Sequence, residues 1–325
     1  MARFIARRLV FFVVTLVLTS LIVFFLTRVL PGDVARVILG REASEEAVAA
    51  KRAELGLDDP LAVQYADWAA DFLAGDWGRR FSGSQEDIRT LVTRRALHSG
   101  WLALVTLLIA VPLSLLLGVI AGLTEGKLPD SVISILTLSV VSLPEFVTGL
   151  FLINTVALGW ADNPLAERFG WFPSSSFIRD DVSFGEALPV LWLPAIAATM
   201  VLLAYIVRLV RAGMIEELKR DYVRTAVLKG LPYRTVIVKH VLRNALIPTI
   251  TVIATSTGWL FSGLVVIETV FSYPGLGSLL VNTAIKSRDL LLIQAIVMLT
   301  VIAILIANFI ADLLYAALNP RIKLE

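Results

Sequence analysis

Residues 9–27, LVFFVVTLVLTSLIVFFLT, form an apolar run without a charged side chain. A helix needs about 20 mostly apolar residues to cross the roughly 30 Å of hydrocarbon in a bilayer, so this run predicts a membrane-spanning helix. Four more uncharged runs have similar lengths, and one further region is interrupted only by Glu145. These five regions are 99–124, 131–161, 187–207, 244–267 and 290–311. We therefore predict an all-α membrane protein with six transmembrane helices.

The composition of the 325-residue chain points to the same fold class. Hydrophobic residues make up 57% and charged residues 17% of the chain, against about 45–50% and about 25% in soluble domains. A globule of this size cannot hide so much apolar surface from water, which excludes a wholly soluble protein. The chain has no cysteine and only two histidines, so we expect no disulfide, no thiol nucleophile and no metal site.

The distribution of charge predicts which side of the membrane each loop occupies. With a cytoplasmic N-terminus, the segments on that side hold 15 Lys and Arg against 7 Asp and Glu, and the segments on the other side hold 13 against 19. Basic residues concentrate in cytoplasmic loops, and the segment 208–243 alone carries 9 of them. We therefore expect both termini in the cytoplasm. The net charge of +2 gives no indication of a nucleic-acid partner.

The predicted spans divide the chain into four parts. Residues 1–30 form the first transmembrane helix, because their apolar stretch is longer than that of a signal peptide and no cleavage site follows it. Residues 31–98 form an extracytoplasmic helical loop, here called the first loop. Residues 99–311 form the core transmembrane domain, which includes a cytoplasmic loop at 208–243, and residues 312–325 form a cytoplasmic tail.

The first loop is too long for a simple connector and predicts two short helices. Ser44 suits the N-cap of a helix that begins at Glu45 and is closed by Gly56. A second helix has Pro60 at its first position and ends at Gly75. Two interpretations remain open: a cap that lies on the membrane surface, or a docking platform for an extracytoplasmic partner.

Residues 208–243, here called the basic loop, are the most informative segment outside the membrane. Residues 214–229 predict one amphipathic helix, Gly230 suits the position after its end, and Pro232 suits the start of the next helix. Two short helices joined at a sharp bend would project from the membrane, where a soluble partner could hold them. The alternative interpretation is a basic surface that rests on anionic lipid.

Sequence motifs for catalysis are missing from the chain. The nearest approach to a phosphate-binding loop, GLTEGKL at 122–128, is one residue too short and lacks the hydroxyl that would hold Mg²⁺. The sequence contains neither H-E-x-x-H nor G-x-S-x-G. It also lacks the dense intramembrane charge of ion-coupled carriers. We predict a non-catalytic membrane protein that has no energy-converting chemistry of its own.

Glu145 is the most informative residue within a predicted span, and it directly follows Pro144. A carboxylate inside the bilayer faces a cavity or a partner by default. Glu145 is therefore a candidate for a substrate pathway or for a structural pair with another helix. Polar residues in spans suit helix packing first and a hydrated path second. The other candidate pathway residues are Ser142, Asn154, Ser256 and Thr257.

The basic loop also carries a family motif. DYVRTAVLKG at 221–230, followed by RNALIP at 243–248, resembles the "EAA" loop of ABC importer permeases, with Arg224 and Thr225 replacing the first two motif residues. Four other segments match the same branch of this family in order. They are ARFIARRL at 2–9 with LPGD at 30–33, ELGLDDP at 54–60, ETVFSYPGLG at 268–277, and DLLY at 312–315 with NPR at 319–321. Together they resemble the first permease subunit of dipeptide/oligopeptide importers.

This resemblance implies a type I ABC importer transmembrane fold in a bacterial inner membrane. It implies a second homologous permease, two ABC ATPase subunits and an extracytoplasmic substrate-binding protein as partners. ATP and Mg²⁺ would be bound by the ATPase subunits, and no cofactor by this chain. Carried onto this sequence, the residues that couple to the ATPases are Tyr222, Arg224, Thr225, Ala226, Lys229, Gly230 and Pro248.

The resemblance implies di- or oligopeptide cargo, but two features depart from the family pattern. Residues 161–169, ADNPLAERF, lengthen the loop before GWFP at 170–173, and Glu145 is unusual after a Leu-Pro pair. Permeases for nickel, glutathione and oligosaccharides belong to the same branch. These cargoes therefore remain alternatives to peptides, and a self-contained secondary carrier remains an alternative to the importer subunit.

Overall fold

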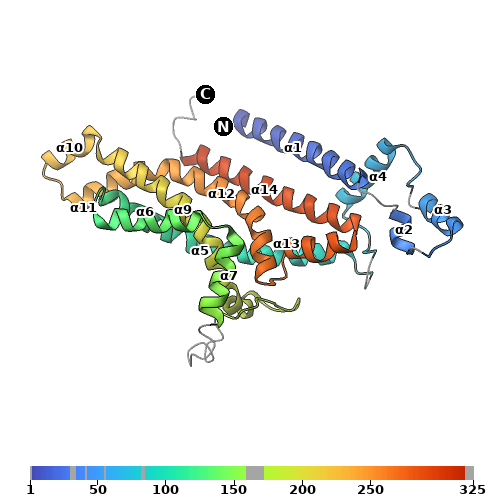
Figure 1. Ribbon diagram of the computed structural model, residues 1–325. Coiled ribbons are helices and arrows are strands. Elements are labelled where there is room, and N and C mark those ends of the chain that lie inside the picture. The colour runs from blue at the N-terminus through green and yellow to red at the C-terminus, as the bar shows by residue number, and fades with distance from the viewer. Residues whose placement is uncertain are drawn as a thin grey trace. The chain divides into compact units, whose positions relative to one another are not determined.

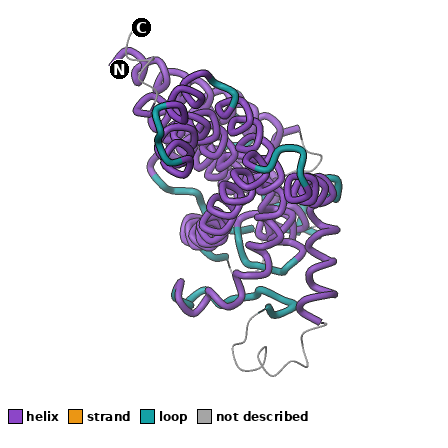
Figure 2. The backbone as a smooth tube through the Cα atoms, turned by 90° about the vertical axis from the view of Figure 1, so that its left-hand side faces the viewer, coloured by secondary structure: helices purple, strands orange, loops and turns teal. Residues whose placement is uncertain are grey.

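The chain is helical wherever its structure is described. The computed structural model describes residues 2–29, 34–40, 42–54, 56–81, 85–158 and 172–318. Figure 2 shows helices joined by loops, and within these ranges no strand forms. The only extended pairing described is an isolated antiparallel bridge between Arg79 and Asp87. The predicted all-α class is confirmed for this part of the chain.

Four described helices are long and apolar enough to cross a membrane on their own. They are α1 (Ala2–Val29), α5 (Ile88–Leu123), α9 (Phe184–Leu218) and α14 (Leu290–Leu318). A fifth crossing forms if α6 (Leu128–Val141) and α7 (Glu145–Leu152) make one broken span. These elements correspond to five of the six predicted spans.

The remaining predicted span corresponds to α12 (Leu242–Val270), which has 29 residues. At 1.5 Å per residue such a helix is about 43 Å long, more than the thickness of the hydrocarbon. Several side chains of α12 lie outside the described part of the chain. The count of six spans therefore stays a prediction.

The interrupted span bends at Pro144. α6 ends at Val141, α7 begins at Glu145, and the two helices differ in direction by 104°. Proline has no N–H to donate and clashes with the preceding turn of a helix. The carbonyl of Pro144 instead accepts the N–H of Val147 at 2.9 Å, which opens the next helix. α7 continues into the π-helical η1 (Ile153–Leu158). Figure 1 shows that α7 turns away from the direction of α6.

The helices divide into two compact units. The first unit contains residues 100–273 together with 1–5 and 304–325, and the second contains residues 6–99 and 274–303. α5 and α14 each contribute to both units because the division falls within these helices. Both units therefore combine segments that lie far apart in the sequence.

α9 is the central helix of the first unit, where it packs against α6, α7 and α12. Small residues allow helices to approach closely in a membrane, where van der Waals packing replaces the hydrophobic effect. Gly118 and Gly122 of α5 serve this purpose. A Cβ added to either glycine would lie 2.5 Å from the Cβ of Val210 or Met214 of α9. Any larger residue at these two positions would push α5 away from α9.

In the second unit, a row of aromatic rings attaches the first loop to α1. The loop contains α2 (Val34–Leu39), α3 (Glu45–Glu54) and α4 (Leu61–Ala74). Phe24 of α1 is fully buried, and its ring centre lies 5.5 Å from that of Tyr65 in α4. The row continues through Trp68 and Phe72 to Trp77, whose ring stacks on Phe72 at 5.0 Å. Each such contact adds roughly 0.5–1.5 kcal/mol beyond burial of area.

Both helices predicted in the first loop form, as α3 and α4, but the loop also contains α2, which is not predicted from the sequence. Ser44 caps α3, because its hydroxyl accepts the N–H of Ala47 at 3.3 Å. α4 ends before Gly75, which has a left-handed φ of 83°. Pro60 is the N-cap residue of α4 rather than its first helical residue. The core of this unit also includes α13 (Leu276–Leu279) and η3 (Leu280–Ile285), which pack near the start of α5.

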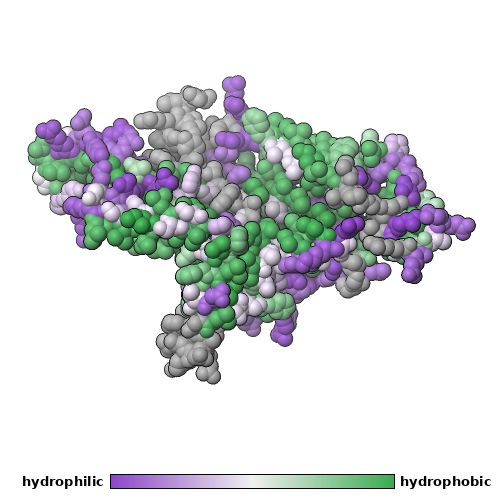
Figure 3. Space-filling view, viewed as in Figure 1, coloured by the Kyte–Doolittle hydropathy of each residue, from purple (hydrophilic) through white to green (hydrophobic). Residues whose placement is uncertain are grey.

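The exposed surface of α1 is apolar. Phe11, Leu18 and Leu26 are 52%, 55% and 61% exposed, although burying one such side chain is worth about 1.5–3 kcal/mol. Figure 3 shows broad hydrophobic areas on the surface of the molecule. Lipid hydrocarbon removes the cost of exposing them, which agrees with the membrane location predicted from composition.

Candidate functional site

The basic loop begins inside α9 and contains three short elements before α12. They are α10 (Asp221–Leu228), α11 (Tyr233–Thr235) and the π-helical η2 (Val236–Val241). The single helix predicted for 214–229 is wrong, because Met214 lies fully buried in α9 and residues 219–220 separate α9 from α10. The prediction ended the span at the first charge, Arg208, whereas charge does not terminate a helix.

Gly230 closes α10, as predicted for the end of this helix. Its φ of 79° lies in the left-handed region, where glycine has no steric penalty. The N–H of Gly230 donates to Val227 O at 2.9 Å, and the N–H of Leu231 donates to Ala226 O at 3.3 Å. Among the described atoms, none lies within 4 Å of a Cβ added at Gly230. Backbone conformation, rather than lack of space, therefore requires the glycine.

One face of α10 is fixed to the core of the first unit. Val223 is 6% exposed and belongs to the same buried cluster as Val236 of η2. The hydroxyl of Tyr222 donates to Glu217 Oε2 at 2.7 Å and accepts from Asn244 Nδ2 at 3.4 Å. Burial raises the pKa of the Tyr222 phenol, and the hydrogen bond to Glu217 raises it further. The phenol therefore remains a donor, and it joins the ends of α9, α10 and α12.

The opposite face of α10 is exposed and mixes apolar with basic side chains. Leu228 is 78% exposed and Arg224 is also exposed. Lys229, just after α10, and Tyr233, the first residue of α11, continue this exposed surface. Figure 3 shows hydrophobic and hydrophilic residues side by side where Figure 1 places α10. Exposed apolar groups with a polar rim are typical of protein interaction surfaces. This face, opposite the anchored side of α10, has the composition of a protein interaction surface.

The structure brings six of the seven predicted coupling residues into α10 and the turn that ends it. Thr225 donates its hydroxyl to Asp221 O at 2.9 Å, and Ala226 packs partly against the core. Pro248 lies in α12, and its side chain is outside the described residues. The six residues are Tyr222, Arg224, Thr225, Ala226, Lys229 and Gly230.

A partly buried ion pair joins α6 to the part of α9 in which the basic loop begins. Arg211 Nη2 lies 2.7 Å from Asp130 Oδ2, and Arg211 Nε binds the second carboxylate oxygen. The side chain of Asp130 is only 5% exposed. The N–H of Gly126 also donates to Asp130 at 2.9 Å, and Ser134 donates to it at 3.3 Å. A nearby exposed pair, Lys219 with Glu125, strengthens this link little.

Sequence reasoning missed the pair of Asp130 and Arg211. Both residues were assigned to loops, whereas both lie within helices. The position of Asp130, one residue after Pro129 at a helix start, was a local signal for a helix terminus, but it does not indicate Arg211 as a partner. Removing one partner of such a pair is strongly destabilising, because it leaves a buried charge without compensation. This pair therefore holds the helix that carries α10, rather than forming a binding site.

Glu145 lies at the break between α6 and α7 and faces α12. Its carboxylate oxygens lie 3.1 Å and 3.3 Å from the position that a Cβ on Gly263 would occupy. Further along the same helices, a Cβ on Gly149 of α7 would lie 3.0 Å from Val270 of α12. α7 and α12 thus pack closely through two glycines, and one of them leaves room for the carboxylate.

The other predicted pathway residues do not converge on Glu145 in the described contacts. Ser142 lies at the end of α6, and its hydroxyl donates to Leu138 O at 2.8 Å. Asn154 lies in η1 and donates to Leu150 O at 2.8 Å. Ser256 and Thr257 lie in α12, and the side chain of Thr257 is outside the described residues. The shared pathway therefore stays a prediction.

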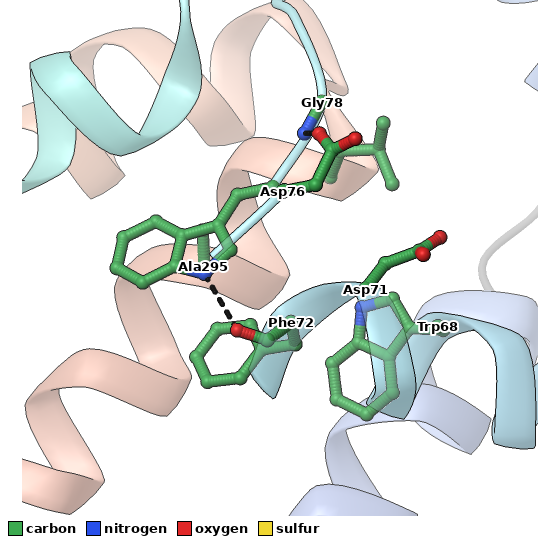
Figure 4. A pocket seen from close by; sticks show the side chains of 8 residues that line it. Trp68, Asp71, Phe72, Asp76, Gly78 and Ala295 are labelled. Carbon is green, nitrogen blue, oxygen red and sulfur yellow. Dashed lines mark hydrogen bonds between the residues drawn. The ribbon is translucent and has the colours of Figure 1, made fainter. Parts of the chain in front are cut away.

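The second unit contains a shallow pocket of about 210 Å³ beside the aromatic row (Figure 4). The rings of Trp68, Phe72 and Trp77 line it together with the carboxylates of Asp71 and Asp76. Trp77 Nε1 donates to Phe72 O at 3.0 Å and fixes the indole. Aromatic faces beside carboxylates suit a cation. Both carboxylates are exposed to water, however, so a cation bound here would be weakly held.

Asp289 connects the first loop to α14 in the second unit. This fully buried carboxylate accepts the N–H of Phe81 at 2.9 Å and the N–H of Leu292 at 3.2 Å. Burial raises its pKa, and the two backbone donors oppose that shift. Asp289 caps α14 and anchors residue 81 of the first loop at the same time. Its role is therefore structural.

Comparison with known proteins identifies the family. Residues 114–324 match the model described as "Binding-protein-dependent transport system inner membrane component", and residues 1–85 match its N-terminal companion model. Glutathione transport system permease protein GsiC of Shigella flexneri serotype 5b is 34% identical over 323 residues, and that of Escherichia coli strain K12 is 33% identical. Both alignments cover 99% of each chain. The chain therefore belongs to the inner-membrane components of binding-protein-dependent transport systems, the permease subunits of ABC importers.

Proposed function

We propose that this permease forms the membrane path for a small peptide-like solute, with glutathione as the first candidate, and that ATPase subunits drive it through α10. Family membership establishes a type I importer fold and a non-catalytic role in which separate subunits hydrolyse ATP. The relatives named above are glutathione permease proteins, which supports that cargo. The observation that carries the coupling role is the exposed, mixed face of α10 on a turn fixed by Val223 and Tyr222.

The proposed mechanism is mechanical. The basic loop and both termini lie in the cytoplasm, and the first loop lies on the opposite side, as the charge distribution predicts. ATP and Mg²⁺ bind to the ATPase subunits, whose closure displaces α10. α9 and α12 carry the displacement into the membrane, because both are continuous helices that flank the basic loop. A second permease completes the path, a binding protein delivers cargo, and bundles rock between two arrangements.

Cross-linking tests the coupling contact directly. The natural chain has no cysteine, so Leu228→Cys introduces a single reactive site at a residue that is 78% exposed on α10. In the assembled transporter, a short thiol cross-linker is expected to join this site to an ATPase subunit. Leu73→Cys on α4, where the leucine is 83% exposed, is the matched control and should give no such product. Equal yields from both sites would refute the assignment.

Substitution of Gly230 tests whether the contact transmits motion. Gly230→Val forces a β-branched residue into a left-handed conformation, at a cost of about 1–2 kcal/mol, and displaces the end of α10. We expect the reconstituted complex to keep basal ATP hydrolysis but to lose most of its stimulation by loaded binding protein. Retention of full stimulated hydrolysis and full uptake would contradict coupling through this turn.

Uptake by the complete transporter tests the cargo. Proteoliposomes that contain this chain, its partner permease and the ATPases are supplied with the cognate binding protein, ATP and labelled glutathione. Unlabelled glutathione and short peptides are expected to compete, whereas Ni²⁺ and oligosaccharides are not. If only nickel or an oligosaccharide competed, the peptide-like cargo would be refuted and the competitor would become the proposed cargo. Uptake by this chain alone, driven by an ion gradient, would refute the importer role and support a self-contained secondary carrier.

A further inference from the structure

The carboxylate of Glu145 occupies a position that differs from an ordinary packing site. It belongs to the first residue of α7, directly after the 104° break in a span. A helix begins there because Pro144 ended the previous one, so the side chain projects from a bend within the membrane-spanning region. Gly263 of α12 faces the carboxylate of Glu145. Because glycine has no Cβ, the two carboxylate oxygens can approach the backbone of α12 at this position.

Glu145 has no compensating group among the described residues. No hydrogen bond or ion pair reaches its carboxylate within the part of the chain that the structure describes, and the residue is neither fully buried nor fully exposed. An ionisable group in a span is expensive when it faces lipid, so such groups face a cavity or an opposite charge. Asp130 in the same unit shows the alternative, because Arg211 and the N–H of Gly126 satisfy its carboxylate.

We propose that Glu145 is a specificity-determining residue whose carboxylate receives the ammonium group of the cargo as it passes the bend between α6 and α7. This inference rests on the proposed function, because the proposed cargoes, peptides and glutathione, carry a free amino group as well as carboxylates. A carboxylate accepts charge-assisted hydrogen bonds from an ammonium group. The absence of a side chain on Gly263 leaves space next to the carboxylate of Glu145. A single charge on a partly buried side chain can bind cargo weakly enough to release it.

Uptake by the complete transporter tests this role. Glu145→Gln keeps the shape of the side chain and removes its charge, and Glu145→Asp keeps the charge on a shorter stem. With wild-type binding protein and glutathione, we expect Glu145→Gln to lower uptake about tenfold, the effect of losing one charged hydrogen bond. Glu145→Asp should recover part of it. Glu54→Gln, which removes an exposed charge from α3, should leave uptake unchanged.

Chemical labelling provides a readout that does not depend on transport. Because the chain lacks cysteine, Glu145→Cys can be modified with a water-soluble methanethiosulfonate reagent. We expect modification in the assembled transporter, and slower modification when cargo-loaded binding protein is present. Leu18→Cys, at an apolar position that is 55% exposed on α1, should stay unmodified in lipid.

The outcomes separate this inference from the proposed function. If wild-type transporter takes up glutathione and Glu145→Gln does so at the same rate, the ammonium site is refuted and the importer role stands. If Glu145→Gln prevents assembly with the second permease, the carboxylate binds a cation on that chain, which also refutes it. If the wild-type transporter takes up no peptide-like solute, the proposed cargo is refuted, and the ammonium site at Glu145 is refuted with it.

Discussion

Asp130 and Glu145 are two carboxylates in the same unit, fifteen residues apart along the chain, with opposite surroundings. Arg211 binds both oxygens of Asp130, and Gly126 and Ser134 donate to it as well. The carboxylate of Glu145 lies beside Gly263, and no hydrogen bond or ion pair reaches it from the described residues. A carboxylate whose partners lie within the chain stabilises one arrangement of helices. A carboxylate without such partners is available to a ligand.

The largest effect is expected from breaking the ion pair of Asp130. Arg211→Ala leaves a buried carboxylate without its cation, which typically costs about 3–5 kcal/mol. We expect a clear fall in the melting temperature of the purified transporter in detergent, with loss of stimulated ATP hydrolysis. The double variant Asp130→Asn with Arg211→Gln should be more stable than Arg211→Ala. An unchanged melting temperature in Arg211→Ala would show that solvent replaces the pair.

A matched pair of glycine substitutions sharpens the comparison at the level of packing. A Cβ on Gly213 would lie 2.9 Å from the backbone oxygen of Ala245, which cannot move without shifting α12. A Cβ on Gly263 would meet the flexible end of Glu145 at 3.1 Å. We expect Gly213→Ala to destabilise by about 1–3 kcal/mol and Gly263→Ala by less than half of that. Thermal melts of the two variants give the ranking, and equal losses would contradict it.

A smaller effect is expected at the anchor of α10. Tyr222→Phe removes the hydrogen bond to Glu217 and leaves a partly buried carboxylate with one donor fewer, at a cost of about 1 kcal/mol. We expect a small fall in melting temperature and a larger fall in the coupling of ATP hydrolysis to uptake. Tyr205→Phe, at a tyrosine of α9 that is 61% exposed and lies outside the basic loop, is the control. Equal coupling in both variants would show that α10 is held by Val223 and its apolar neighbours.

The smallest effect on stability is expected at Glu145. Since no described group compensates its charge, Glu145→Gln should leave the melting temperature unchanged or raise it slightly, within about 0.5 kcal/mol. Differential scanning fluorimetry of the purified transporter measures this directly. A loss comparable to that of Arg211→Ala would reveal a hidden partner, and the contrast between the two carboxylates would disappear.

The sequence predicts the parts of this fold that local chemistry decides. Long uncharged runs predict helices at the spans because a bilayer leaves few alternatives. Gly230 predicts the end of α10, and Ser44 predicts the start of α3, because both depend on neighbouring backbone groups. The prediction for 214–229 was wrong because it treated Arg208 as a boundary, whereas α9 continues to Leu218.

Contacts between distant segments are what the sequence does not reveal. Asp130 and Arg211 are 81 residues apart, and neither residue carries a local signal for the other. The approach of Glu145 to Gly263 depends on the packing of α7 against α12, which follows from the shapes of both helices. Glu145 could be singled out as an intramembrane charge, but the surface that it faces could not.

The length of α9 has a mechanical consequence. Its 35 residues extend about 52 Å at 1.5 Å per residue, roughly 20 Å more than the hydrocarbon thickness. Its two prolines, Pro189 and Pro194, both lie in the first third, so no proline interrupts the stretch that leads to α10. That stretch acts as a stiff lever: a push of a few ångströms at one end arrives at the other end with little loss to bending.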